Sequence, residues 1–294
     1  MAIQFTKMHG LGNDFIVIED LDCSIEIPAE TIAWLCDRNL GIGGDGLILV
    51  RPATSGEADY FMLYHNADGS KAEMCGNGVR CFAKYLVDHA LVDSSLGELK
   101  VETLGGIKPI RYELTSAGSL STATVDMGKP RIISEDISDL MPDDIASDYS
   151  IETPYGEFTA TAVSMGNPHA VIWVDDVDQA PVTTAGPIIE NNPIFPLKTN
   201  VEFAQVVGAD RIRLRVWERG VGETLACGTG ACATLVAASL ADLVGRSATI
   251  ELPGGELFIL WDTDDHIYMT GPATEVFSGT INLYLTENER MRSQ

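Results

Sequence analysis

The sequence lacks any run of 18 apolar residues, which excludes a long apolar helix that crosses a membrane. It also lacks a basic segment followed by an apolar stretch near its N-terminus, so we expect no signal peptide. Cysteine is sparse, at 6 of 294 residues. That excludes a disulfide scaffold, and together these absences predict reduced thiols in a cytoplasmic protein.

Basic residues are also few, with 19 Lys and Arg against 43 Asp and Glu and a formal net charge of −24. The electric field of such a negative net charge repels phosphate backbones, so we expect no nucleic-acid partner. An anionic substrate would therefore need a local cationic or dipolar pocket. Hydrophobic residues make up 45% of the chain, which is typical of a globular protein, and the length allows two domains.

Alternating and apolar runs predict a mixture of strands and helices. Strands are expected at 15–18, 47–50, 160–163, 170–174, 211–217 and 257–261. Helices are expected at 29–39, 79–92 and 231–244, the last of them ending at Gly245 as a C-cap. The acidic stretch 134–148 is expected to form a solvated helix or loop.

The two halves of the chain repeat one another weakly. MHGLGNDFIVI (8–18) and VSMGNPHAVIWV (163–174) each place Gly-Asn just before a strand. Asn13 and Asn167 lie 154 residues apart, and Cys75 and Cys227 lie 152 apart. Two unrelated landmarks at almost one offset indicate a duplicated domain, since each copy must keep its order of elements to bury its own core.

Two Cys-Gly-x-Gly segments stand just before helical runs, in EMCGNGVRC (73–81) and LACGTGAC (225–232). Their glycines leave bare backbone N–H groups at a helix start, where partial positive charge binds anions. Cys75 and Cys227 stand at the rim of these starts, where the pKa of a thiol is commonly lowered. The helices behind them are largely apolar, which places them at domain centres. We therefore predict that each domain presents one thiol and one anion cradle to a common cleft.

The cysteines and glycines also allow other interpretations. A free cysteine is usually a small buried hydrophobe, and that is how we interpret Cys23, Cys36, Cys81 and Cys232. Zinc is not expected, because C-x-x-C is absent and the histidine spacing is unsuited. GIGGDG (41–46) fits the dinucleotide fingerprint, but a helical run precedes it and a strand follows, which is the reverse of the required order. These glycines are expected to form a tight turn near a ligand or another backbone.

Polar residues beside these segments are further candidates. Glu218 and Arg219 follow an alternating strand just ahead of the second thiol, and they correspond by offset to Asn66 and Ala67 in the first copy. They form either an ordinary surface ion pair or a substrate site. In the second case Arg219 binds a carboxylate with two hydrogen bonds and Glu218 binds an ammonium group. His169, in GNPHAV, is either a core histidine or a proton-handling group.

In this order, KMHGLGNDF, NADGS, CGNGVRC, SMGNPH, ERGVGETLACGTGAC and LPGG resemble the diaminopimelate epimerase family, and the likeness covers nearly the whole chain. Proline racemase and its relatives share the paired-cysteine plan, but their first motif typically reads Cys-Gly-His where this chain has Cys75-Gly76-Asn77. One departure is Gly46, where many family members have Gln. A backbone or water-mediated contact would have to substitute for that side chain.

The resemblance implies a cofactor-free inversion at an α-carbon that interconverts LL- and meso-diaminopimelate, serving lysine and peptidoglycan precursors, in a homodimer. Cys75 and Cys227 would be the two bases, supported by His169 and Glu218, with no metal. The substrate-binding residues implied by the same match are Asn13, Asn66, Gly76, Asn77, Asn167, Asn200, Glu218, Arg219, Gly228 and Thr229.

The fold implied is α/β (α+β), with two pseudo-symmetric domains that each wrap a curled mixed β-sheet around a central apolar helix, and an active site in the cleft between them. The expected boundaries are 1–127 and 128–277, with a last strand at about 278–288 returning to the first domain. A racemase of another amino acid is the rival with the same fold. Rivals from other classes are a thiol redox protein, in which Cys75 and Cys227 would form a working disulfide, and a non-catalytic binding module.

Overall fold

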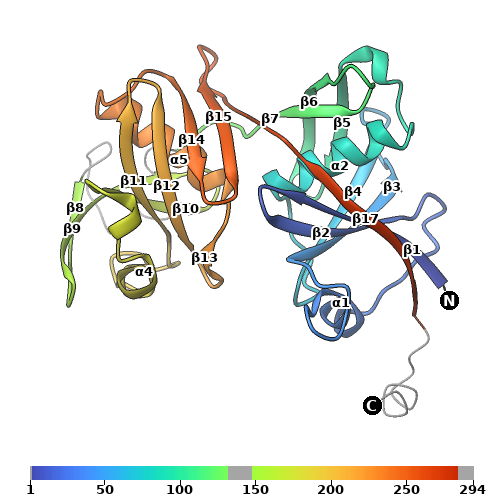
Figure 1. Cartoon of the computed structure of the whole chain (residues 1–294), viewed down its shortest axis with the longest axis horizontal. Helices are drawn as coiled ribbons and strands as arrows, with labels where there is room; N and C mark the ends of the chain where they lie inside the picture. Colours follow the sequence, from blue (N-terminus) through green and yellow to red (C-terminus); the bar gives the residue numbers. More distant parts are fainter. Residues whose placement is uncertain (1, 132–147, 284–294) are drawn as a thin grey trace. The chain divides into compact units, whose positions relative to one another are not determined.

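The computed structural model describes residues 2–131 and 148–283, and these form two compact units (Figure 1). Unit 1 contains residues 2–10, 14–121 and 273–283, and unit 2 contains residues 11–13, 122–131 and 148–272. The domain boundaries 1–127 and 128–277 stay a prediction. Residues 134–147 of the acidic stretch lie outside the described residues.

Unit 1 is a mixed sheet with two α-helices. Strand β17 is antiparallel to β1, β1 pairs with β2, and β2 is parallel to β3. Then β3 is antiparallel to β4, β4 parallel to β5 and β5 antiparallel to β6. The elements are β1 (Ala2–Gly10), β2 (Asn13–Glu19), α1 (Ala29–Cys36), β3 (Gly46–Pro52), β4 (Tyr60–Asn66), α2 (Gly76–Asp88), η1 (Ser94–Leu96), β5 (Glu98–Thr103), β6 (Gly106–Leu114) and β17 (Thr274–Asn282).

Unit 2 repeats this arrangement. Strand β8 is antiparallel to β9, β9 antiparallel to β10, β10 parallel to β11 and β11 antiparallel to β12. Then β12 is parallel to β14, β14 antiparallel to β15, β15 antiparallel to β16 and β16 antiparallel to β7. The elements are β7 (Leu120–Asp126), β8 (Asp148–Thr153), β9 (Gly156–Ser164), β10 (Pro168–Trp173), η2 (Val177–Gln179), α4 (Val182–Glu190), β11 (Asn200–Gly208), β12 (Arg211–Glu218), β13 (Gly222–Thr224), α5 (Gly228–Leu240), β14 (Ser247–Leu252), β15 (Gly255–Trp261) and β16 (Ile267–Gly271).

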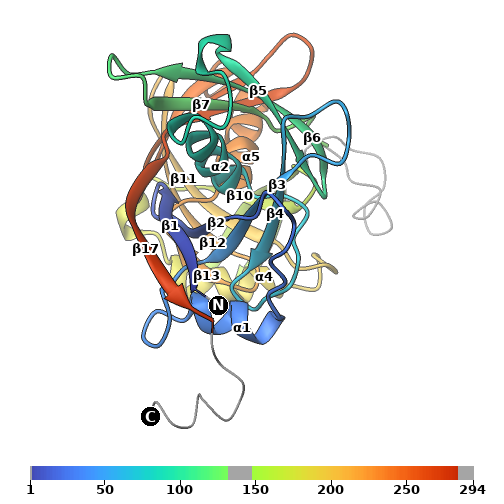
Figure 2. The ribbon, with the colours of Figure 1, turned by 90° about the vertical axis from the view of Figure 1, so that its right-hand side faces the viewer.

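The shared sequence of pairings confirms the predicted fold class of two pseudo-symmetric mixed sheets. In each unit a parallel pair is connected through a helix (α1 or α4), an antiparallel strand follows, and the chain then enters the long helix (α2 or α5). The chain's last described strand, β17, completes unit 1 by lying along β1 (Figures 1 and 2). It begins at Thr274, ahead of the expected position near 278, and residues 284–288 of the expected strand lie outside the described residues.

A long helix packs against the strands of each unit and forms its centre. Helix α2 contacts β1, β3, β4, β5 and β17, and Figure 2 shows it among these strands. Helix α5 contacts β9, β10, β11, β14, β15 and β16. Every residue of α2 except Asp88 is buried, including Arg80 and Lys84, so the central position predicted for these helices is confirmed.

The central helices begin and end earlier than predicted. They start at Gly76 and Gly228 rather than near 79 and 231, because a cysteine side chain caps each first turn. They end at Asp88 and Leu240. The prediction of Gly245 as the C-cap is wrong.

Left-handed residues explain both helix ends. Ala90 and Asp242 each have φ of 55°, and the following N–H groups, of Leu91 and Leu243, return to helical carbonyls at 2.9 Å. This is the reversal that usually uses glycine, and here alanine and aspartate make it, so the sequence contains no glycine signal at either end.

The GIGGDG segment follows α1 and precedes β3, which confirms the order that disfavours a dinucleotide site. Helix α1 ends at Cys36 rather than 39, because the N–H groups of Ile42 and Gly43 fold back onto the carbonyl of Leu35 at 2.9 Å. A Cβ on Gly41 would lie 2.0 Å from the carbonyl oxygen of Trp34. The glycine is therefore required by a close backbone approach.

Candidate active site

Cys75 caps the central helix of unit 1. Its Sγ accepts a hydrogen bond from the Gly78 N–H at 3.5 Å, and its backbone is extended, with φ −135° and ψ 119°. The side chain is half-buried. The predicted placement of this thiol at a helix start is confirmed, and the Gly78 N–H of the first turn lies beside the sulfur.

A buried arginine lies under the same helix start. Arg80 is fully buried, and its guanidinium donates to Gly76 O at 3.3 Å and to Asn77 Oδ1 at 2.9 Å. Glycine at position 10 leaves room for it, since a Cβ there would lie 3.0 Å from Arg80 Nη2. Arg80 therefore adds positive charge to the helix start and fixes the side chain of Asn77, a role that the sequence did not reveal.

Gly46 and Asn66 face each other across β3 and β4. The Asn66 amide donates to Ser70 Oγ at 3.0 Å and so closes the turn after β4. A Cβ on Gly46 would lie 2.5 Å from both the His65 carbonyl oxygen and Cε2 of Tyr64. The phenol of Tyr64, which is 7% exposed, thus fills the space that a side chain at position 46 would take.

Cys227 caps the central helix of unit 2 in the same way. Its Sγ accepts from the Gly230 N–H at 3.4 Å and lies 3.6 Å from Thr229 Oγ1. The side chain is only 5% exposed. Burial raises the pKa of the Cys227 thiol well above its usual range, the negative charges of Glu218 and Glu202 raise it further, and the hydrogen bonds from Thr229 and Gly230 oppose this. The expected lowering of the thiol pKa is therefore wrong for Cys227, because desolvation outweighs the helix start.

A chain of polar side chains leads from the core of unit 2 to this thiol. His169 lies 2.6 Å from Glu202 Oε1 through Nδ1, and 3.0 Å from Asn167 Oδ1 through Nε2. The Asn167 amide donates to Thr229 Oγ1 at 3.3 Å. Three predicted site residues, Asn167, His169 and Thr229, are thus brought together next to Cys227, and Glu202 joins them as a residue that the sequence did not single out.

Asn200 connects two further predicted residues. Its amide donates to Pro168 O at 2.8 Å, and its Oδ1 accepts from the Arg219 backbone N–H at 2.9 Å. The Arg219 side chain is exposed and donates to Leu197 O at 3.0 Å. Glu218 accepts from the Thr224 hydroxyl. Asn200 therefore holds the end of β12, from which Arg219 extends into solvent.

Asn13 follows a tight segment that belongs to unit 2. Leu11 and Gly12 have φ of 58° and 86°, and a Cβ on Gly12 would lie 2.6 Å from Cδ1 of Leu225. A Cβ on Gly254, in the LPGG motif, would lie 1.8 Å from Leu11 O. These glycines let residues 11–13 pack closely against the loop that leads to Cys227.

The remaining cysteines differ from the two at the helix starts. Burial raises the pKa of Cys36 to about 11 and that of Cys81 to about 12; Cys232 is also buried, and Cys23 is exposed. Across residues 2–131 and 148–283 no group of three or more His, Cys, Asp or Glu could hold a metal ion. No helix in that part of the chain has the length and apolar character needed to span a membrane.

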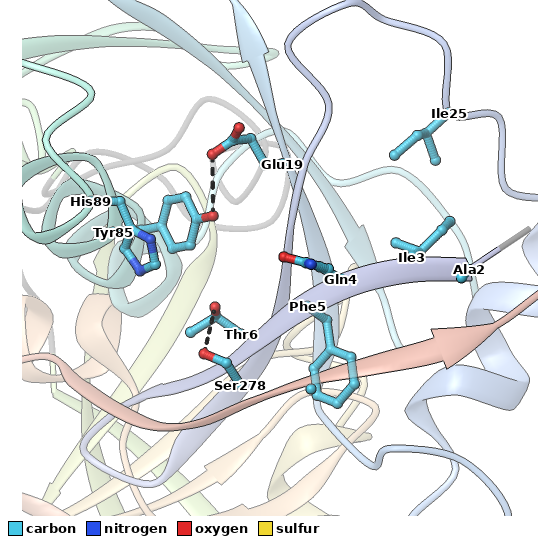
Figure 3. Close-up of a pocket in the computed structure, with 11 residues that line it drawn as sticks. Ala2, Ile3, Gln4, Phe5, Thr6, Glu19, Ile25, Tyr85, His89 and Ser278 are labelled. Atoms are coloured by element: carbon cyan, nitrogen blue, oxygen red, sulfur yellow. Dashed lines mark hydrogen bonds between the residues drawn. The ribbon is translucent and has the colours of Figure 1, made fainter.

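A separate pocket of about 440 Å³ lies in unit 1 among β1, β2, α2 and β17 (Figure 3). Tyr85 and His89 stack on one side of it, with ring centroids 4.0 Å apart, and the Tyr85 hydroxyl donates to Glu19 at 3.4 Å. None of the predicted site residues lines this pocket.

Comparison with known proteins agrees with the motif pattern. The family model described as diaminopimelate epimerase matches residues 5–133 and 161–276. The chain is 46% identical over 282 residues to diaminopimelate epimerase of Methanococcus maripaludis, covering 96% of this chain and 100% of the relative. It is 48% identical over 280 residues to that of Pelotomaculum thermopropionicum, covering 94% and 98%.

Solved structures show the same fold at low identity. A hydroxyproline epimerase from Agrobacterium vitis, with bound trans-4-hydroxy-L-proline, aligns with a TM-score of 0.71 at 16% identity, covering 96% of this chain and 93% of that one. A PhzF-family phenazine biosynthesis protein from Bacillus anthracis aligns with a TM-score of 0.67 at 16% identity, covering 96% and 100%. From the family match and the full-length relatives, the chain is an isomerase that belongs to the diaminopimelate epimerase family.

Proposed function

We propose that this protein epimerises LL-2,6-diaminopimelate to the meso isomer without a cofactor, using Cys75 and Cys227 as paired acid and base. The observation that carries the proposal is that each unit places a cysteine at the N-cap of its central helix, at matching positions of the repeat. Two thiols in equivalent settings, in a chain of this family, suit a reaction that needs two equivalent groups.

Inversion at a carbon requires two bases, because a single fixed base returns the proton to the side from which it came. One cysteine, as thiolate, removes the α-proton, and the other, as thiol, protonates the opposite face. Burial raises the pKa of Cys227, which favours the protonated form that a proton donor needs. We assign Cys75, which is half-buried where Cys227 is buried, as the base when the substrate first binds.

The carbanion must be stabilised by the site itself. In the proposed mechanism the substrate's reacting carboxylate lies at the helix starts, where the N–H groups around Gly76, Asn77, Gly228 and Thr229 are directed at it. The buried guanidinium of Arg80 adds positive charge behind the first turn of α2. Exclusion of water from the closed site would strengthen both effects.

The other predicted residues are assigned to the remaining parts of the substrate. Arg219 binds the distal carboxylate, Glu218 binds an ammonium group and supports a thiol, and His169 supports Cys227. Asn13, Asn66, Asn167 and Asn200 position the substrate or the groups that touch it. We further propose that the enzyme is a cytoplasmic homodimer that supplies lysine and peptidoglycan precursors.

The test uses purified protein with no added cofactor. LL-diaminopimelate should be converted to the meso isomer, as followed by chiral chromatography, and L-proline should not be racemised. Cys75→Ala and Cys227→Ala should each lose at least about a thousandfold in kcat, whereas Cys23→Ser, at an exposed site, should stay near wild type. Turnover of proline but not of diaminopimelate, or near-wild-type activity in either alanine variant, would reject the proposal.

A further inference from the structure

Unit 2 contains a buried pair of ionisable groups, His169 and Glu202, of which Glu202 has no role in the proposed function. His169 Nδ1 and Glu202 Oε1 are 2.6 Å apart, and neither side chain is exposed to solvent. The second carboxylate oxygen, Oε2, is buried and makes no hydrogen bond to any described residue. A carboxylate in this position is costly unless its partner neutralises it.

The protons of this pair can be assigned from its neighbours. His169 Nε2 lies 3.0 Å from Asn167 Oδ1, and a carbonyl oxygen only accepts hydrogen bonds, so Nε2 carries a proton. The contact at Nδ1 then needs one further proton, held either by the imidazole or by Glu202. In both cases the pair is neutral overall and His169 is a donor toward Asn167.

The direction of hydrogen-bond donation, away from His169, continues to the thiol of Cys227. Because Asn167 Oδ1 accepts from His169, its amide nitrogen donates to Thr229 Oγ1 at 3.3 Å. The Thr229 hydroxyl accepts this bond and keeps its own hydrogen, which is directed at Cys227 Sγ, 3.6 Å away. Each residue from His169 onward therefore donates a hydrogen bond to the next, and the Thr229 hydroxyl donates to the sulfur of Cys227.

We propose that Glu202 is a positioning residue that, through His169, directs this chain of hydrogen-bond donors at the sulfur of Cys227 and so stabilises its thiolate. The role given to Glu202 rests on the proposed function, because only a reversible epimerisation requires Cys227 to become a thiolate in one of its two directions. Its geometry is independent of the substrate.

The charged groups around Cys227 make the sign of the effect testable. Burial raises the thiol pKa first, and the charges of Glu218 and Glu202 raise it further, while the Thr229 and Gly230 hydrogen bonds lower it. If Glu202 acted only as a nearby negative charge, removing it would make the thiolate easier to form. If it acts through the donor chain, removing it makes the thiolate harder to form.

The experiment measures the pH dependence of iodoacetamide alkylation at Cys227 by peptide mass spectrometry. The background is Cys23→Ser with Cys75→Ala, which leaves Cys227 with only buried cysteines as competitors. Thr229→Val should slow alkylation at pH 7.5 by about tenfold, the effect of losing one hydrogen bond to a charged group. Glu202→Met should slow it several-fold. Glu202→Gln, whose amide can donate to Nδ1 in place of the acid, should stay within about twofold of the background.

A second measurement keeps the proposal testable if a variant unfolds. In the wild-type protein, ¹⁵N-histidine NMR, with His169→Asn to assign one of the 5 histidines, should show a proton on Nε2 of His169. A bare Nε2 would overturn the proposal, and so would faster alkylation in both Glu202 variants. Neither readout depends on turnover, so failure of the epimerase assay and failure of this inference are separate results.

Discussion

Arg219 is the residue whose proposed role depends most on the type of its side chain. It is exposed at the end of β12, its backbone is held by Asn200, and its guanidinium donates to Leu197 O. A planar guanidinium binds a carboxylate with two parallel hydrogen bonds, which the point charge of lysine cannot reproduce. Arg219→Lys should therefore lower kcat/KM for LL-diaminopimelate by about tenfold to a hundredfold.

Arg111→Lys is the matched control, because Arg111 is also exposed and lies on β6. It should leave kcat/KM unchanged, and both variants should keep the wild-type melting temperature. If Arg219→Lys behaves like the control, Arg219 is an ordinary surface residue and does not bind the distal carboxylate.

The burial of His65 allows a prediction of how the stability of the folded protein depends on pH. It is 6% exposed, and within residues 2–131 and 148–283 neither ring nitrogen has a hydrogen-bond partner. Burial lowers its pKa, and the positive charges of Lys71 and Arg51 lower it further. The unfolded chain, with a pKa near about 6.5, therefore binds a proton that the folded state resists, so stability is full above that pH and falls as the pH drops below it.

The measurement is the urea midpoint of wild type and His65→Phe between pH 5 and 8. Phenylalanine has similar size and does not titrate, so the variant should lose less stability than wild type on acidification. Parallel curves for the two proteins would show that His65 is not the group responsible. The other histidines are present in both proteins, so their contributions cancel in the comparison.

Single residues differ in how well the sequence identified them. Cys75 and Cys227 were identifiable because residue type and flanking glycines both point to a helix start. Glu202 and Arg80 were not, since a charged residue within a strand or helix is ordinarily solvated, and only the fold shows that both are fully buried. The contact between Glu202 and His169 joins residues 33 positions apart on neighbouring strands, and no local pattern encodes it.

At the scale of elements, the starts of the central helices show what local sequence can and cannot predict. The glycines behind each cysteine indicated where the helices begin to within three residues, but the cap itself depends on a sulfur accepting from Gly78 or Gly230. The helix ends were missed because Ala90 and Asp242 adopt the left-handed conformation. Tertiary packing, rather than a local preference, sets those ends.

The two helix starts also differ in how much room they leave, which gives a matched pair of substitutions. A Cβ on Gly230 would lie 2.8 Å from Glu202 Oε1 and 3.3 Å from Cys227 Sγ. A Cβ at the equivalent Gly78 would make only ordinary contacts, the nearest at 3.4 Å. Gly230→Ala should therefore destabilise the protein by about 1–3 kcal/mol and reduce kcat, while Gly78→Ala should keep nearly full stability.

Chemical unfolding of both variants measures the difference. Equal stability losses would mean that Glu202 and Cys227 can move aside without penalty. That result would also weaken the case for a fixed geometry around Cys227, because a site that yields to an added methyl group does not hold its sulfur firmly.

At the scale of the whole molecule, the internal repeat was the most informative feature of the sequence. The near-constant offset between Asn13–Asn167 and Cys75–Cys227 predicted two copies of one unit, and the strand pairings of β2–β3–β4 and β10–β11–β12 repeat in the same order. The individual pairings could not be predicted. The register of β17 on β1 joins residues 265 to 280 positions apart, from His9–Thr274 to Ala2–Asn282, and no local pattern specifies such a contact.

The central claim, that two thiols act on one α-carbon, is tested most directly by carrying out the reaction in D₂O. LL-diaminopimelate is incubated with purified enzyme and no cofactor, and at low conversion the isomers are separated and analysed by mass spectrometry. The meso product should carry one deuterium at the inverted carbon, and the remaining LL substrate should carry almost none, because the group that takes the proton is not the group that returns one. Deuterium entering the recovered substrate as fast as the product, or meso product that keeps its original α-hydrogen, would contradict the two-base mechanism.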